Sequence, residues 1–201
     1  MNDPVDRAAQ QRGRRKFLLI AAVFALPVLA SWLLFFAFPN WIPADTTNRG
    51  DLVQPGRPTV ELPLADETGE QVRLTNRWSL VLFDDGDCGR VCAQRLLMTR
   101  QLRLTLNNRM TRLDRVLIVP PGTDIAALHA LLDAAHPDLR ILLDRGGEAS
   151  ALFGPKGAPP ATGSLHLVDP IGNYMMRYAP GFEAEPLRKD IVRLLRASQI
   201  G

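Results

Sequence analysis

The chain contains only two cysteines, Cys88 and Cys92, and they stand four residues apart. They follow the short apolar run Leu80–Phe83 and open a stretch that we predict to be helical over residues 88–109. A helix N-terminus stabilises a thiolate, and residues four apart share a helix face, so the two sulfur atoms can approach each other. The pair therefore predicts a redox-active disulfide in an oxidising compartment, or a soft-metal site for Cu(I).

A small stapling disulfide without redox chemistry is the alternative interpretation of the pair. Asp84, Asp85 and Asp87 place negative charge beside Cys88, which disfavours its thiolate. A regular helical turn holds Cα atoms four residues apart near the upper end of disulfide geometry, so we expect closure to distort the first turn. We expect Cys88 to be the more exposed thiol and Cys92 to resolve the mixed disulfide.

The elements that must position the cysteines alternate between strands and helices after residue 60. This alternation, ending in a hairpin and a helix, predicts an α/β domain in three layers with a mostly parallel centre. The expected strands are Val60–Leu64, Gln71–Leu74, Leu80–Phe83, Val116–Val119, Arg140–Leu143, Leu165–Val168 and Tyr174–Tyr178. The other expected helices are Asp124–Ala135, Glu148–Phe153 and Glu185–Ala197.

An uncharged apolar stretch, residues 17–38, precedes this domain. Its 22 residues, at 1.5 Å each, are long enough for a transmembrane helix, and its aromatic border favours an uncleaved anchor over a signal peptide. The basic cluster before Phe17 predicts a cytoplasmic N-terminus and a periplasmic C-terminal domain, single-pass in a bacterial inner membrane. We therefore expect a basic tail (1–16), a transmembrane helix (17–38), a linker (39–59) and a folded domain (60–201).

The segments FDDGDCGRVC (83–92) and LHLVDPIGNYMMRY (165–178) resemble the thioredoxin-like domain of the Sco/SenC family. These are membrane-anchored proteins of cytochrome c oxidase biogenesis, and the likeness covers about residues 58–196 and the single anchor. It implies a thioredoxin-like α/β fold, with a central mixed sheet flanked by helices. Cys88 and Cys92 match the family's cysteines, which bind copper with a distant histidine and exchange disulfides.

The sequence departs from the family pattern at three places. Gly89 and Ala93 stand where the family has a proline after each cysteine, and Ala161 stands where it has its histidine. The remaining candidate ligand set for copper is Cys88, Cys92 and His166. Two thiolates alone leave Cu(I) under-coordinated, so we expect copper binding to be weak or absent, and His166 to be a packed core residue unless its strand faces the cysteines.

Two further groups of residues invite a functional reading. The stretch 90–115 carries seven arginines and one acid, either as a solvated helix face or as a docking surface for anionic lipid or an acidic partner. His129 and His136 are expected to be surface or capping residues.

The leading hypothesis is a membrane-anchored periplasmic thioredoxin-like protein of cytochrome c oxidase biogenesis, acting as a thiol–disulfide exchanger or copper-site chaperone. The competing hypothesis is a non-catalytic interaction module that binds an oxidase subunit or assembly factor. Residues 1–16 carry the whole net charge of +3, so the folded part is neutral, which argues against nucleic acid as a partner. No Walker loop, GxGxxG, HExxH or nucleophile-elbow pattern occurs, so nucleotide binding and hydrolysis are not indicated.

Overall fold

In the computed structural model the chain divides into two compact units, residues 1–47 and 48–201. The structure describes residues 4–37, 48–155 and 158–200, and for 4–13 it describes the backbone only. The first unit is helix α1 (Pro4–Ala37), which continues through Pro27. Its segment Arg14–Ala37 has a mean hydropathy of 2.5 and is long and apolar enough to cross a membrane. A candidate transmembrane helix therefore precedes the folded domain.

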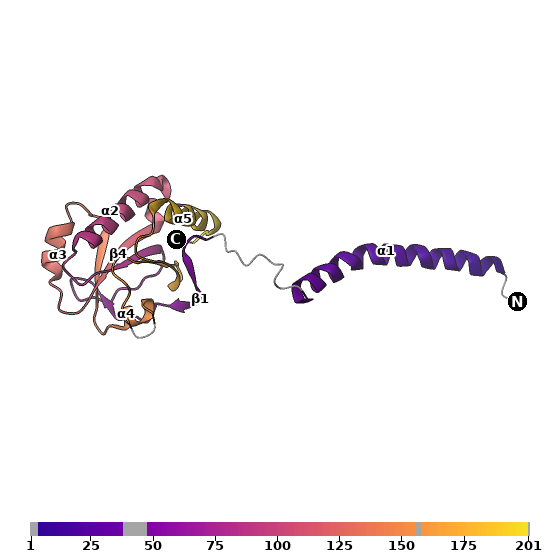
Figure 1. Cartoon of the computed structure of the whole chain (residues 1–201), viewed down its shortest axis with the longest axis horizontal. Coiled ribbons are helices and arrows are strands. Elements are labelled where there is room, and N and C mark those ends of the chain that lie inside the picture. The colour runs from indigo at the N-terminus through magenta and orange to yellow at the C-terminus, as the bar shows by residue number, and fades with distance from the viewer. Residues whose placement is uncertain (1–3, 38–47, 156–157, 201) are drawn as a thin grey trace. The chain divides into compact units, whose positions relative to one another are not determined.

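The second unit is built on a seven-stranded mixed sheet of order β1-β7-β6-β3-β4-β5-β2 (Figure 1). Its central strands β3, β4 and β5 are parallel, and every other pairing is antiparallel. The strands are β1 (Asp51–Pro58), β2 (Leu64–Ala65), β3 (Trp78–Phe83), β4 (Leu113–Val119), β5 (Leu139–Asp144), β6 (Leu165–Val168) and β7 (Asn173–Tyr178).

The sheet is covered on both faces, so β3 and β4 are buried along nearly their whole length. One face packs against α2 (Arg90–Thr105), α3 (Ile125–Leu132) and α5 (Ala184–Ala197), with Leu82, Leu117 and Leu165 in the shared core. A 3-10 helix, η2 (Asn107–Arg112), follows α2. The opposite face packs against α4 (Glu148–Phe153) and the segment 62–74. Both cores lie within residues 48–201, so this unit has what it needs to fold without α1.

Most strands and helices lie close to their expected positions, with three differences. Of the expected strand Val60–Leu64 only Leu64 is in a strand, as part of β2, and the expected strand Gln71–Leu74 is reduced to an isolated bridge between Ala65 and Gln71. The leucines of these two segments are buried because they pack into the core beside α4, and not because they belong to long strands.

The third difference concerns the expected linker. We expected a linker over residues 39–59, but Asp51–Pro58 forms β1, which pairs with β7 at the edge of the sheet. Pro55, Gly56 and Pro58 give this strand the composition of a linker, and an edge strand tolerates such residues because only one side of it must form hydrogen bonds. Residues 39–47 of the expected linker lie outside the described part of the chain.

Candidate functional site

The two cysteines form a disulfide at the point where β3 leads into α2. Cys88 lies in the loop that follows β3, and Cys92 lies in the first turn of α2, with their Cα atoms 5.0 Å apart. Helix α2 begins only after Cys88, with Gly89 as its N-cap. The distortion that we expected in the first helical turn falls instead on Cys88, whose φ of 43° is in the left-handed region.

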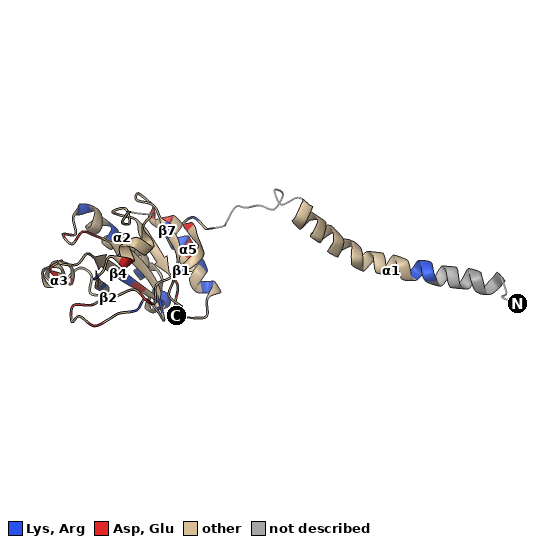
Figure 2. Ribbon diagram, turned by 90° about the horizontal axis from the view of Figure 1, so that it is seen from below, with Lys and Arg blue, Asp and Glu red and all other residues tan. Residues whose placement is uncertain are grey.

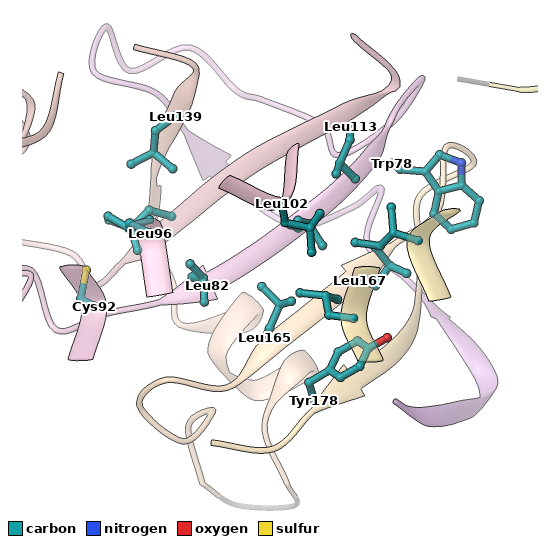
Figure 3. Packing of buried hydrophobic residues seen from close by; sticks show 14 of the residues in the cluster. Trp78, Leu82, Cys92, Leu96, Leu102, Leu113, Leu139, Leu165, Leu167 and Tyr178 are labelled. Atoms are coloured by element: carbon teal, nitrogen blue, oxygen red, sulfur yellow. The ribbon is translucent and has the colours of Figure 1, made fainter. Parts of the chain in front are cut away.

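Both cysteines are buried, each 7% exposed, within the core between the sheet and α2. Figure 3 shows Cys92 on the side of α2 that carries Leu96, with Leu82 of β3 nearby. Equal burial gives neither sulfur atom an advantage in access, so exposure does not single out Cys88 as the attacking thiol. Access to the bond from outside is limited to the small exposed part of these two residues.

The loop before Cys88 is held by Asp84. Its carboxylate accepts the backbone N–H of Gly86 at 3.0 Å and that of Cys88 at 2.7 Å. Burial raises the pKa of Asp84, the two backbone hydrogen bonds act in the opposite direction, and nearby Asp85 raises it further. Sequence reasoning treated Asp84 only as a negative charge near the thiol, whereas the structure makes it the acceptor that fixes the loop.

Two hollows flank this loop. A groove of about 510 Å³ lies between Asp85–Asp87, Pro120–Asp124 and the start of α3. A smaller hollow of about 210 Å³ lies beside Phe83 and Asp84, and Pro159, Pro160 and Thr162 form part of its wall. The loop that leads to Cys88 is therefore bordered by concave surface on two sides.

His166 lies on the opposite face of the sheet from the cysteines. It pairs with Val81 on β3, and its neighbours on β6, Leu165 and Leu167, belong to the core that holds Cys88 and Cys92. Because successive strand residues alternate between faces, the His166 side chain points to the other core. The structure therefore does not bring His166 to the cysteines.

The surroundings of His166 are those of a packed core histidine. Its ring nitrogens lie 3.0 Å from the hydroxyl of Ser164 and 3.0 Å from that of Tyr174, and the rings of Phe83 and Phe153 pack against it. Burial lowers the pKa of His166 to about 4, and nearby Arg177 adds to this. The ring is thus neutral in the pH range in which most proteins work.

The other two histidines, His129 and His136, have partners other than the cysteines. His129 on α3 has Asp133 at 2.8 Å and Glu67 at 3.3 Å. We expected His136 on the surface or at a helix end, but it is buried beside Arg115. Within the described residues, no group of three or more His, Cys, Asp or Glu side chains could hold a metal ion. The donor set Cys88, Cys92 and His166 therefore does not fit one copper ion.

Arg115 is a residue of the site that sequence reasoning grouped with the surface arginines. It is 1% exposed on β4, and it donates to the carbonyl of Leu96 at 2.6 Å and to the hydroxyl of Thr99 at 3.2 Å. Asp138 accepts from it at 3.1 Å. Arg115 thereby fixes α2, the helix that carries Cys92, to the sheet. An arginine adjoining the apolar run Val116–Val119 was the signal that could have revealed it.

Comparison with known proteins places this domain among thioredoxin-like folds. A family model described as "Transmembrane-like, thioredoxin-like, C-terminal domain" matches residues 78–198. No curated protein matches the chain in sequence. The family match covers β3, both cysteines and all the elements that follow them through α5.

Solved structures of Sco proteins share the fold. Apo Sco1 from Thermus thermophilus has a TM-score of 0.57 and 22% identity over 77% of this chain and 98% of that one. Copper-bound ScoI from Bradyrhizobium japonicum has a TM-score of 0.52 and 18% identity over 69% and 98%. BsSco, a Sco-family cytochrome c oxidase assembly protein with a disulfide switch, has a TM-score of 0.54 and 16% identity over 73% and 96%. The expected thioredoxin-like fold, and with it the resemblance to Sco proteins, is confirmed.

Proposed function

Since this chain belongs to the family of transmembrane-like, thioredoxin-like C-terminal domains, we propose that it is a membrane-anchored thiol–disulfide exchange protein of cytochrome c oxidase biogenesis. The observation that carries the proposal is the Cys88–Cys92 bond at the N-terminus of α2, in the loop after a central strand. The candidate span Arg14–Ala37 and the basic residues at its start support a single-pass anchor with the domain on the periplasmic side. The link to oxidase assembly comes from the Sco proteins that share the fold.

The exchange uses the two sulfur atoms in sequence. A thiolate of a partner protein attacks one sulfur of the Cys88–Cys92 bond, that bond breaks, and the other cysteine leaves as a thiolate. A second thiolate of the partner then attacks the mixed disulfide. The partner gains a disulfide, and Cys88 and Cys92 take up its two electrons and become thiols. The N-terminus of α2 stabilises the thiolate that each step releases.

No step of this exchange passes through copper. Thiolates, and not a disulfide, bind Cu(I), and His166 lies on the other face of the sheet. A role as a copper carrier would require the reduced form and a third ligand from elsewhere. The arrangement of the described residues therefore favours the exchange role over the copper-chaperone role.

An equilibrium redox titration of the full chain in detergent tests the proposal. The thiol content is measured by alkylation and mass spectrometry after equilibration in glutathione and dithiothreitol buffers. We expect a reversible couple with a potential above about −300 mV, the value below which structural disulfides commonly lie. As a matched pair, Cys88→Ser and Cys92→Ser each leave one thiol, and the variant that traps a mixed disulfide identifies the sulfur that a partner attacks.

One observation favours a second function, that of a non-catalytic interaction module. Both cysteines are only 7% exposed, as in a disulfide that serves stability alone. A pair that stays oxidised well below −300 mV would support this module and exclude the exchange role.

A further inference from the structure

Helix α2 presents an outer face that the fold leaves uncovered. Leu97 and Leu104 are 48% and 51% exposed on this face. They are seven residues apart, which is two helical turns, so they lie on one line along the helix, and Arg90 begins the same line. The inner face of the helix is fully used, since Cys92, Leu96, Thr99 and Leu102 are buried against the sheet. The exposed leucines are not needed for packing within the domain, so they indicate a second apolar surface that a binding partner can cover.

The stretch that forms this surface carries positive charge only. From Arg90 to Arg112 the chain carries six arginines and no acidic residue. Arg90 and Arg109 are exposed and Arg100 is half-buried, and within the described part of the chain none of these three forms an ion pair. Because residues 17–201 sum to zero charge, this basic face is a local feature that orients the domain and not a consequence of overall charge.

The chain enters the domain beside this helical layer. The backbone N–H groups of Arg49 and Gly50 donate to Asp190 of α5 at 2.8 and 3.0 Å. Helix α5 lies next to α2 on the same face of the sheet (Figure 2). Arg112 of η2 donates to the carbonyl of Leu195 near the end of α5 at 2.8 Å. The attachment point and the basic helix thus belong to one layer of the domain.

The tether is also short. Ten residues, 38–47, separate the end of the candidate span at Ala37 from Asn48, and even fully extended they reach only about 35 Å. If α1 crosses a membrane, as the proposed function holds, the residue at which the domain begins, Asn48, is always within about this distance of the end of the span.

From these observations we propose that the outer face of α2, formed by Arg90, Leu97, Arg100 and Leu104, docks on an anionic lipid surface together with Arg109 of η2. The arginines meet lipid phosphates, and the two leucines enter the boundary between headgroups and acyl chains. Cys88 and Cys92 lie at the N-terminal end of the same helix, so docking holds the disulfide close to the plane of the membrane. The proposal concerns lipid binding alone and stands or falls separately from the redox role.

Vesicle sedimentation of the 48–201 domain tests this assignment, with circular dichroism to confirm that each variant is folded. The probes are vesicles of phosphatidylcholine with 30% phosphatidylglycerol and vesicles of phosphatidylcholine alone. We expect binding to the anionic vesicles only, weakening as salt rises, with roughly a fivefold loss for each arginine replaced. Arg90→Gln with Arg109→Gln should therefore weaken binding at least tenfold, and Leu97→Glu with Leu104→Glu should abolish it.

Matched controls lie elsewhere on the domain. Arg73→Gln removes an exposed arginine, and Ile171→Glu changes an apolar side chain that is 66% exposed in the β6–β7 turn. Both should bind anionic vesicles like the unaltered domain. Equal binding to both kinds of vesicle, no binding to either, or equal losses in the control variants would overturn the assignment. Retention on polyglutamate without vesicle binding would also overturn it and would point to an acidic protein partner.

Discussion

The carboxylate of Asp84 accepts the backbone N–H of Cys88 at 2.7 Å, so the acid closest in sequence to β3 fixes the conformation of the cysteine four residues later. It also accepts the N–H of Gly86 at 3.0 Å. Cys88 needs this support because a non-glycine residue at a φ of 43° carries backbone strain.

Replacing Asp84 should therefore weaken the oxidised domain. Asp84→Ala leaves two N–H groups without their acceptor and should lower the free energy of unfolding by about 1–3 kcal/mol. Asp84→Asn retains one acceptor oxygen and should cost less. Urea unfolding of the oxidised protein measures both. If the alanine and asparagine variants are as stable as the unaltered protein, Asp84 does not hold the loop.

The buried His166 should make the domain sensitive to acid. Burial lowers its pKa to about 4 in the folded state, whereas the unfolded chain takes up this proton near 6.5. The contribution of neutral His166 to the free energy of unfolding is therefore complete above about pH 6.5. It falls as the pH drops from about 6.5 to about 4, and it is lost below about pH 4. The loss attributable to this one group is about 3 kcal/mol.

Urea unfolding between pH 4.5 and 7.5 tests this with His166→Gln as the comparison. The glutamine variant has lower stability at pH 7 but should show a clearly shallower decline toward acid. His136, whose pKa burial also lowers, acts in the same direction and remains in both proteins. Parallel pH profiles would show that His166 is not the source of the acid sensitivity.

Arg115 should be among the least replaceable charged residues in the domain. Arg115→Met removes the donors to Leu96 and Thr99. It also removes one of the two arginines that pair with Asp138, since Arg103 lies 3.4 Å from the same carboxylate. We expect a loss of about 1–3 kcal/mol, because buried acceptors lose their hydrogen bonds while Arg103 still pairs with Asp138. Asp138→Asn should cost less in the Arg115→Met background than in the unaltered protein, since one of its two ion pairs is then already absent. Strictly additive effects of the two substitutions would exclude coupling between them.

Substitutions at Gly163 and Gly122 can distinguish the cost of backbone strain from the cost of a steric contact with Val91 at the start of α2. Its φ is 80°, and a Cβ there would lie 2.8 Å from a methyl carbon of Val91. Gly163→Ala should therefore cost more than Gly122→Ala, where φ is 90° and no atom lies within 4 Å of the added Cβ. We expect a difference of about 1 kcal/mol in thermal or urea unfolding, in the range of mild overpacking. In the Val91→Ala background the difference should vanish, and its persistence there would rule out the contact.

Much of the fold was predictable because local pattern and tertiary environment agree. The helix Glu148–Phe153 and the strand Leu165–Val168 have the predicted bounds, and the cysteine pair lies at the predicted strand–helix junction. β1 was not predictable because its two prolines and its glycine are typical of a linker. Its strand conformation depends on pairing with β7, which is distant in the sequence.

The side-chain partners in the site were less predictable than its position. Which face of β6 carries His166 depends on the register with β3, and a shift of one residue would reverse it. The role of Arg115 likewise depends on Asp138, which lies 23 residues away in the chain.

The way the chain enters the domain has a mechanical consequence. Asp190 is 1% exposed, and besides Arg49 and Gly50 it accepts the hydroxyl of Tyr178 at 2.7 Å. A pulling force along the segment before Arg49 therefore acts first on the carboxylate of Asp190. This residue lies on α5, which is packed against the core through Leu187 and Ile191.

The hydrogen bonds between β1 and β7 begin at Asp51, after the two residues that bond to Asp190. Without Asp190, a pull on the tether would act directly on this edge of the sheet and could break its bonds one at a time. A pull on the tether therefore meets the bonds to Asp190 before it reaches the first pair of the β1–β7 ladder, Asp51 and Arg177.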